Sequence, residues 1–112
     1  MSTAYTRKEK AELRKIANEA WASELSSELE KLFEDFCTWT DNGMSAFDLT
    51  DQIHEFHNGV SRELYKQYTV LPPEIAVARA IVLGIASEKS IDSPLLEKLQ
   101  PLIKAHRDWK EK

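Results

Sequence analysis

Apolar residues recur every three or four positions along almost the whole chain of 112 residues, and this spacing constrains the fold more than any other feature. Such a repeat places apolar side chains on one face of an α-helix. The chain holds only three glycines and four prolines, so few positions interrupt the pattern. The sequence therefore predicts an all-α fold, a compact bundle of four to five helices, with helical segments at 7–40, 45–68, 73–89 and 94–110.

Turn and capping residues separate these segments. Gly43 follows the first segment and suits the left-handed conformation that often ends a helix. Ser45 begins the second segment as an N-cap residue, with a carboxylate three positions later. Pro73 and Pro94 open the last two segments, because the first helical turn tolerates a residue without an N–H group.

The first segment carries two apolar faces that point in nearly opposite directions. The N-terminal face and residue 21 beside it comprise Leu13, Ile16, Ala17, Ala20 and Trp21. The C-terminal face comprises Leu25, Leu29, Leu32, Phe33 and Phe36. We favour a break near residues 21–27, where Ser27 and Glu30 fit a new capping box. Alternatively the helix continues and its N-terminal face meets another subunit, which makes that set of five residues the candidate association face of a homodimer.

The segment 73–89 is apolar almost all round, so it is predicted to be the buried central helix. Ala76, Ala80 and Gly84 form a stripe of small side chains along which a neighbouring helix can approach closely. Arg79 is the one charged residue in the middle of this segment. We expect it to form a salt bridge with a carboxylate from the acidic middle of the chain, and a second interpretation makes it an anion-binding residue.

Charge is distributed unevenly along the chain, whose formal net charge is -4. Residues 24–55 contain nine acidic side chains and a single basic one, Lys31, whereas residues 7–15 and 104–112 are predominantly basic. These regions can attract each other within one chain or between chains. The net negative charge makes nucleic acid an unfavourable partner.

Cys37 is the sole cysteine, so no disulfide forms within the chain and a reducing, cytoplasmic compartment is expected. Its position next to a phenylalanine predicts a small buried side chain. No stretch reaches the ~18 uncharged apolar residues of a membrane span, and the N-terminus lacks the apolar core of a signal peptide. The chain is predicted to be a single domain over residues 1–112, with residues 1–6 as a frayed tail.

Residues 45–68 contain the one cluster that suggests chemistry. Asp51, His54 and His57 are spaced three apart, so their side chains lie near one another on a helix. The candidate polar site comprises Asp51, His54, His57, Asn58, Arg62 and Tyr65. Carboxylate and imidazole are common ligands of a catalytic divalent metal, and this triplet would supply half of such a site. His106 would join it if the second and fourth helices were neighbours.

Packing is the alternative role of the two histidines, and His57 is expected to be partly buried. The chain has no phosphate-binding glycine loop, no Cys-x-x-Cys and no nucleophile motif, so catalytic residues are left unassigned. We therefore predict a small non-catalytic interaction or regulatory protein that forms a homodimer or binds a protein partner, without a cofactor. The alternative is a divalent-metal-dependent enzyme built on Asp51, His54 and His57, and the sequence leaves the identity of any small-molecule ligand unknown.

Overall fold

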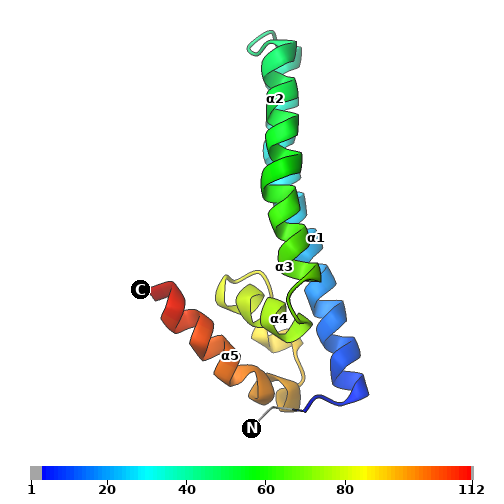
Figure 1. Ribbon diagram of the computed structural model, residues 1–112, viewed down its shortest axis with the longest axis vertical. Coiled ribbons are helices and arrows are strands. Elements are labelled where there is room, and N and C mark those ends of the chain that lie inside the picture. Colours follow the sequence, from blue (N-terminus) through cyan, green and yellow to red (C-terminus); the bar gives the residue numbers. More distant parts are fainter. Residues whose placement is uncertain (1–3, 112) are drawn as a thin grey trace.

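The computed structural model describes residues 4–111 (Figure 1). The α-helices are α1 (Arg7–Thr40), α2 (Ala46–Phe56), α3 (Arg62–Thr69), α4 (Pro73–Val82) and α5 (Ser93–Glu111). A π-helical turn, η1 (His57–Ser61), joins α2 to α3, and a 3₁₀ turn, η2 (Glu88–Ser90), precedes α5. Among these residues no strand occurs, and the helices pack on one another, which confirms the predicted all-α bundle.

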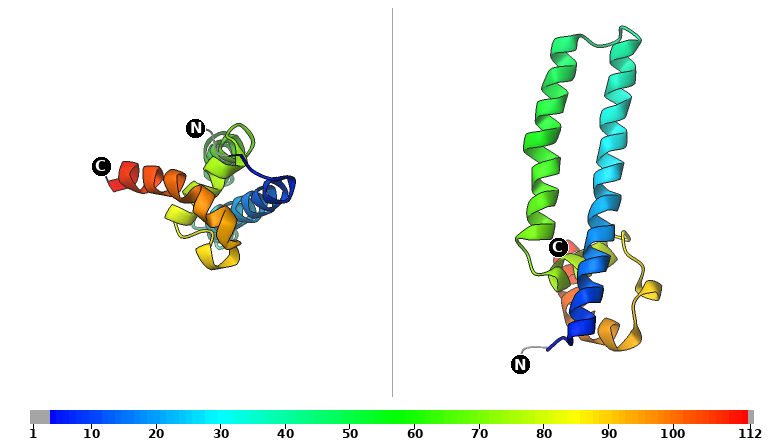
Figure 2. Two further views of the ribbon diagram at one scale, coloured as in Figure 1. Left: turned by 90° about the horizontal axis from the view of Figure 1, so that it is seen from below. Right: turned by 90° about the vertical axis from the view of Figure 1, so that its right-hand side faces the viewer.

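The molecule consists of a projecting hairpin and a small base (Figure 2). The hairpin is formed by the C-terminal half of α1 running antiparallel to α2, η1 and α3, and the base by the N-terminal half of α1 with α4 and α5. The principal extents are 57 × 32 × 24 Å and the radius of gyration is 17.5 Å. A compact chain of this length would have a radius of gyration of about 13 Å, so the bundle is markedly elongated.

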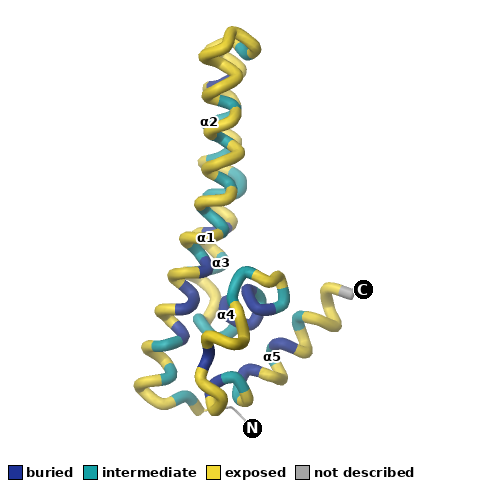
Figure 3. Tube along the Cα trace, turned by 180° about the vertical axis from the view of Figure 1, so that it is seen from behind, coloured by how far each residue is buried: buried dark blue, intermediate teal, exposed yellow. Residues whose placement is uncertain are grey.

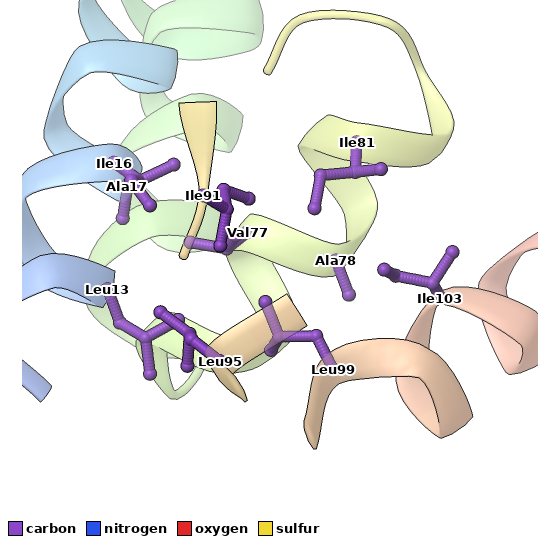
Figure 4. Packing of buried hydrophobic residues seen from close by; sticks show 10 residues of the cluster. All are labelled: Leu13, Ile16, Ala17, Val77, Ala78, Ile81, Ile91, Leu95, Leu99 and Ile103. Carbon is purple, nitrogen blue, oxygen red and sulfur yellow. The ribbon is translucent and has the colours of Figure 1, made fainter. Parts of the chain in front are cut away.

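The hydrophobic core lies in the base, where three helices and one loop residue meet (Figure 4). Leu95, Leu99 and Ile103 recur every fourth position on α5 and turn one fully buried stripe towards α4 and α1. The core comprises Leu13, Ile16 and Ala17 of α1, Val77, Ala78 and Ile81 of α4, Ile91, and Leu95, Leu99 and Ile103 of α5.

Helix α1 is continuous over 34 residues, so the predicted break near residues 21–27 is wrong. No glycine or proline interrupts this stretch. The Ser27 hydroxyl donates to the carbonyl of Ser23 four residues earlier (3.2 Å), which keeps Ser27 inside the helix instead of capping a new one. The two apolar faces persist on one helix because each has its own neighbour.

The neighbour of the N-terminal face belongs to the same chain. Leu13, Ile16, Ala17 and Ala20 are all buried, with exposures of 8% or less, because α1 packs on α4 in the base. The assignment of these residues to an association face is therefore wrong: they face their own chain. The uninterrupted helix that carries two differently directed faces, one of the two interpretations of the sequence, is the one observed.

The hairpin turn follows the predicted pattern with a shift of one residue. Asn42 takes the left-handed conformation with φ of 63°, in place of Gly43. The N–H of Gly43 then donates to the carbonyl of Thr38 (2.9 Å). The Ser45 hydroxyl oxygen accepts from the N–H of Asp48 (3.0 Å), as its N-cap role predicts.

Helix α4 ends at Val82, so the predicted segment 73–89 is too long. Gly84 adopts φ of 78°, and the N–H groups of Ile85 and Ala86 donate to the carbonyl of Ala80 (2.8 and 3.2 Å), which closes the helix end. Gly84 is therefore a stop signal and not the third member of a packing stripe. Half of the α4 residues are buried, which agrees with a central position in the base.

Residues 4–6 of the predicted frayed tail are held by α5, while residues 1–3 lie outside the described part. Lys98 Nζ donates to the carbonyl of Ala4 (3.1 Å) and to Glu9 Oε1 (2.6 Å), and Tyr5 packs against the core. The hydrogen bond from Lys98 lowers the pKa of Glu9. Within residues 4–111 every helix is too short or too polar to cross a membrane.

The position of Leu13 generates a first prediction. Leu13→Glu places a carboxylate in a site that is 1% exposed, so it should unfold the base rather than release a folded monomer. We expect loss of the cooperative urea transition, followed by circular dichroism at 222 nm. Phe47→Glu, at an 84% exposed position, is the control and should keep the wild-type transition. A folded Leu13→Glu protein would contradict this placement.

Two glycines provide a matched second prediction. Gly84→Ala should cost about 1–2 kcal/mol of unfolding free energy, because alanine is strained at positive φ. Gly59→Ala, in η1 with no atom within 4 Å of the added Cβ, should stabilise the protein by about 0.5–1 kcal/mol. Urea unfolding of both variants measures the difference, and a destabilised Gly59→Ala would show that η1 requires glycine.

Candidate functional site

A carboxylate from α1 joins the hairpin to the base. Glu24 accepts two hydrogen bonds from Arg79 of α4, from Nη1 to Oε2 (3.0 Å) and from Nη2 to Oε1 (3.2 Å). Its Oε2 also accepts from the hydroxyl of Tyr68 on α3 (2.6 Å). The salt bridge expected for Arg79 is thereby confirmed, and Glu24 occupies both terminal nitrogens of the guanidinium group, so the anion that this arginine binds is a carboxylate of its own chain.

The surroundings of this carboxylate shift two pKa values. Burial and the neighbouring Glu24 raise the pKa of the Tyr68 hydroxyl, which keeps it protonated and donating. Hydrogen bonding and attraction to Glu24 outweigh the opposing effect of burial and raise the pKa of Arg79. The side chains of Arg79 and Glu24 are 24% and 15% exposed, so this partly buried pair is shielded from screening by salt.

Aromatic rings cover the same joint. Trp21 of α1 stacks on Tyr68 with ring centroids 6.0 Å apart and planes at 8°, and meets Tyr65 edge-on at the same separation. Trp21 Nε1 is buried and has no hydrogen-bond partner among the described residues. Like Leu13, Trp21 thus contacts its own chain, and its ring fixes α3 against α1.

The six residues of the candidate polar site are spread along the second arm of the hairpin, which consists of α2, η1 and α3. Asp51 and His54 lie on α2, His57 and Asn58 in η1, and the remaining two on α3. All six are exposed, and Tyr65 is 57% exposed although its ring meets Trp21 edge-on.

Metal coordination receives no geometric support from this arrangement. Among residues 4–111 no three His, Cys, Asp or Glu side chains are placed to hold an ion. His106 lies on α5, where it lines an open apolar groove of about 480 Å³ with Leu83 and Trp109, away from the hairpin histidines. The metal site of Asp51, His54 and His57 remains a prediction from spacing.

The hairpin also carries an exposed apolar surface that the sequence analysis did not predict. Leu29, Phe33 and Phe36 of α1 are 45%, 65% and 38% exposed, and their spacing of four and three residues aligns them on one side of the helix. We call these three residues the outer apolar face. Figure 3 shows that burial is concentrated in the base, whereas the hairpin is largely exposed.

Two-helix geometry explains this exposure. In the hairpin α1 is covered by α2 and η1 along one side, and a single neighbour buries only a narrow stripe of a helix. The apolar face of α1 is wider than that stripe, so its outer edge stays in solvent. The same geometry exposes Cys37 and His57, which were wrongly expected to be buried. The width of the apolar pattern was the sequence signal for this surface.

Comparison with known proteins assigns neither a family nor a function. No protein-family model, no curated protein sequence and no solved structure matches the chain.

Tyr68 generates a third prediction. Tyr68→Phe removes the hydroxyl that donates to Glu24, so the unfolding free energy at pH 8 should fall by about 1–2 kcal/mol. The folded state raises the pKa of Tyr68 above its ordinary value of 10.0, so wild-type stability from this group is complete below pH 10 and is lost as the pH rises beyond it.

Tyr68→Phe has no hydroxyl to ionise and so cannot lose that contribution. The difference in unfolding free energy between wild type and Tyr68→Phe should therefore narrow between pH 10 and 11.5. Urea unfolding at each pH measures it. Tyr65→Phe, at an exposed ring, is the control and should keep the wild-type pH dependence. A constant difference between wild type and Tyr68→Phe at all these pH values would contradict the role of the hydroxyl.

Proposed function

We propose that this protein is a non-catalytic interaction protein whose hairpin is a projecting arm that docks a helical protein partner on the outer apolar face. The observation that carries the proposal is the exposure of Leu29, Phe33 and Phe36 in one line on a rigid helix. Covering a large apolar side chain contributes about 1.5–3 kcal/mol, so a partner that buries all three gains a useful binding energy.

The shape of this surface favours a helix as the partner. Side chains at intervals of four and three residues form a ridge along α1, and another helix packs such a ridge between its own side chains. Antiparallel α1 and α2 already form two helices of a bundle, and a third helix on the outer face would complete the burial that one neighbour leaves unfinished.

Charge supports the choice of partner. The exposed carboxylates Glu30, Glu34 and Asp41 follow the outer apolar face towards the hairpin end, and Lys31 is the one basic residue between positions 24 and 55. A helix that carries apolar residues flanked by lysine or arginine complements this surface in both respects. The partner is therefore expected to present a basic amphipathic helix.

Site-specific photo-crosslinking provides the fourth prediction. Photoreactive benzoylphenylalanine in place of Phe33 should form a discrete protein adduct in cells that express the protein. The same residue in place of Phe47 is the matched control, because Phe47 is 84% exposed and helical geometry turns it away from α1. The proposal fails if position 33 yields no adduct or if both positions yield the same adducts.

A further inference from the structure

We infer that the partner of the outer apolar face is a second copy of this chain, whose α1 packs antiparallel against α1 to form a symmetric dimer. This inference rests on the proposed function, since it names the occupant of the same surface. The occupied surface extends beyond the outer apolar face along the whole of α1.

One exposed stripe runs the length of α1. At 100° per residue, Ala11, Lys15 and Asn18 repeat the angular positions of Leu29, Phe33 and Phe36 five turns earlier. All six therefore lie within one sector of the helix surface that is about 60° wide. Ala22 falls in the same sector. All seven positions are exposed, and the buried residues Leu13, Ile16, Ala17 and Ala20 lie on the opposite side of the helix.

The neighbouring helices leave this stripe open. The base packs on the side of α1 that carries Leu13 and Ile16, and α2 and α3 lie on the side that carries Trp21, Leu25 and Leu32. Figures 1 and 2 show α1 at the edge of both the hairpin and the base. A second α1 can therefore approach along its full length of about 51 Å.

Side-chain size along the stripe is complementary only in the antiparallel sense. The N-terminal half presents Ala11, Asn18 and Ala22, and the C-terminal half presents larger apolar side chains. A two-fold axis between Ser23 and Glu24 places Ala11 opposite Phe36 and Asn18 opposite Leu29, with the two Ala22 residues near the axis. Phe36 and Leu29 then each meet a smaller side chain, as close helix packing requires, and Phe33 lies opposite Arg14.

Charge selects the same arrangement. The N-terminal half of α1 is net basic, with five basic residues (Arg7, Lys8, Lys10, Arg14, Lys15) against three glutamates, and the C-terminal half is net acidic, with five acidic residues (Glu24, Glu28, Glu30, Glu34, Asp35) against Lys31. Antiparallel packing opposes basic to acidic halves twice, once at each end of the dimer. Parallel packing would set like charges side by side. The second copy thus supplies the basic helix that the outer apolar face requires.

The symmetry of the contact also closes the assembly. Because the same stripe is used by both copies, two chains satisfy each other and no surface is left to recruit a third. The basic flanks at Lys8 and Lys15 lie on the same side of the stripe as Glu30 and Glu34, and a two-fold axis brings those flanks together.

A charge-exchange experiment provides the fifth prediction. Wild type should sediment at equilibrium as a dimer, with twice the chain mass of 12.9 kDa. Lys8→Glu/Lys15→Glu and Glu30→Lys/Glu34→Lys should each weaken the dimer at least tenfold, because like charges then face each other. The protein with all four substitutions should regain the dimer, since exchanged charges attract as before.

Two controls exclude a general effect of net charge and a loss of folding as causes of a weaker dimer. Lys104→Glu/Arg107→Glu changes the net charge by the same amount as Lys8→Glu/Lys15→Glu, on exposed positions of α5, and should leave the dimer dissociation constant unchanged. Circular dichroism verifies that every variant keeps its helical content. Failure of the four-substitution protein to regain the dimer, or a wild-type dimer that neither double variant weakens, would overturn the antiparallel arrangement.

The crosslinking readout separates this inference from the proposed function. An adduct of two identical chains at position 33 supports both. A monomeric wild type whose position 33 crosslinks to a different protein overturns the second copy and leaves the proposed function standing. A monomeric wild type with no adduct at position 33 overturns both.

Discussion

The structure depends on an uninterrupted α1 that carries two apolar faces on opposite sides. The face with Leu13 and Ile16 organises the base, and the face with Leu25 and Leu32 pairs with α2 and η1. Because the two faces share one helix, base and hairpin are rigidly connected without a linker. The hairpin projects from the base since α4 and α5 reach only the first half of α1, which gives the molecule its length of 57 Å.

The direction of α3 is fixed at the point of α1 where one apolar face gives way to the other. Glu24 lies at this point of α1 and binds Arg79 of α4 and Tyr68 of α3 at once, while Trp21 stacks on the same tyrosine. Three helices are thereby joined through one carboxylate that is largely shielded from water. Its hydrogen bonds hold α1, α3 and α4 together at the junction of the hairpin and the base.

Exposure on the hairpin follows from the number of helices rather than from their composition. Two antiparallel helices bury one narrow seam, so Phe33 and His57 both remain in solvent although one is apolar and the other was expected at a buried margin. The spacing of Asp51, His54 and His57 was read correctly as helical, yet spacing alone does not say what faces a helix.

Local physical chemistry made much of the fold predictable from the sequence. Helical periodicity, the Ser45 cap and Pro73 act within one turn, so they located the helices. The predicted end of α4 was wrong because the apolar pattern continues past Gly84, whose left-handed conformation ends the helix.

The carboxylate expected to pair with Arg79 was placed within residues 24–55, but only the tertiary structure identified it as Glu24. It also decided that the Leu13 face is covered by the same chain, because contacts between residues more than sixty positions apart depend on how the chain returns in space and leave no periodic signal in the sequence.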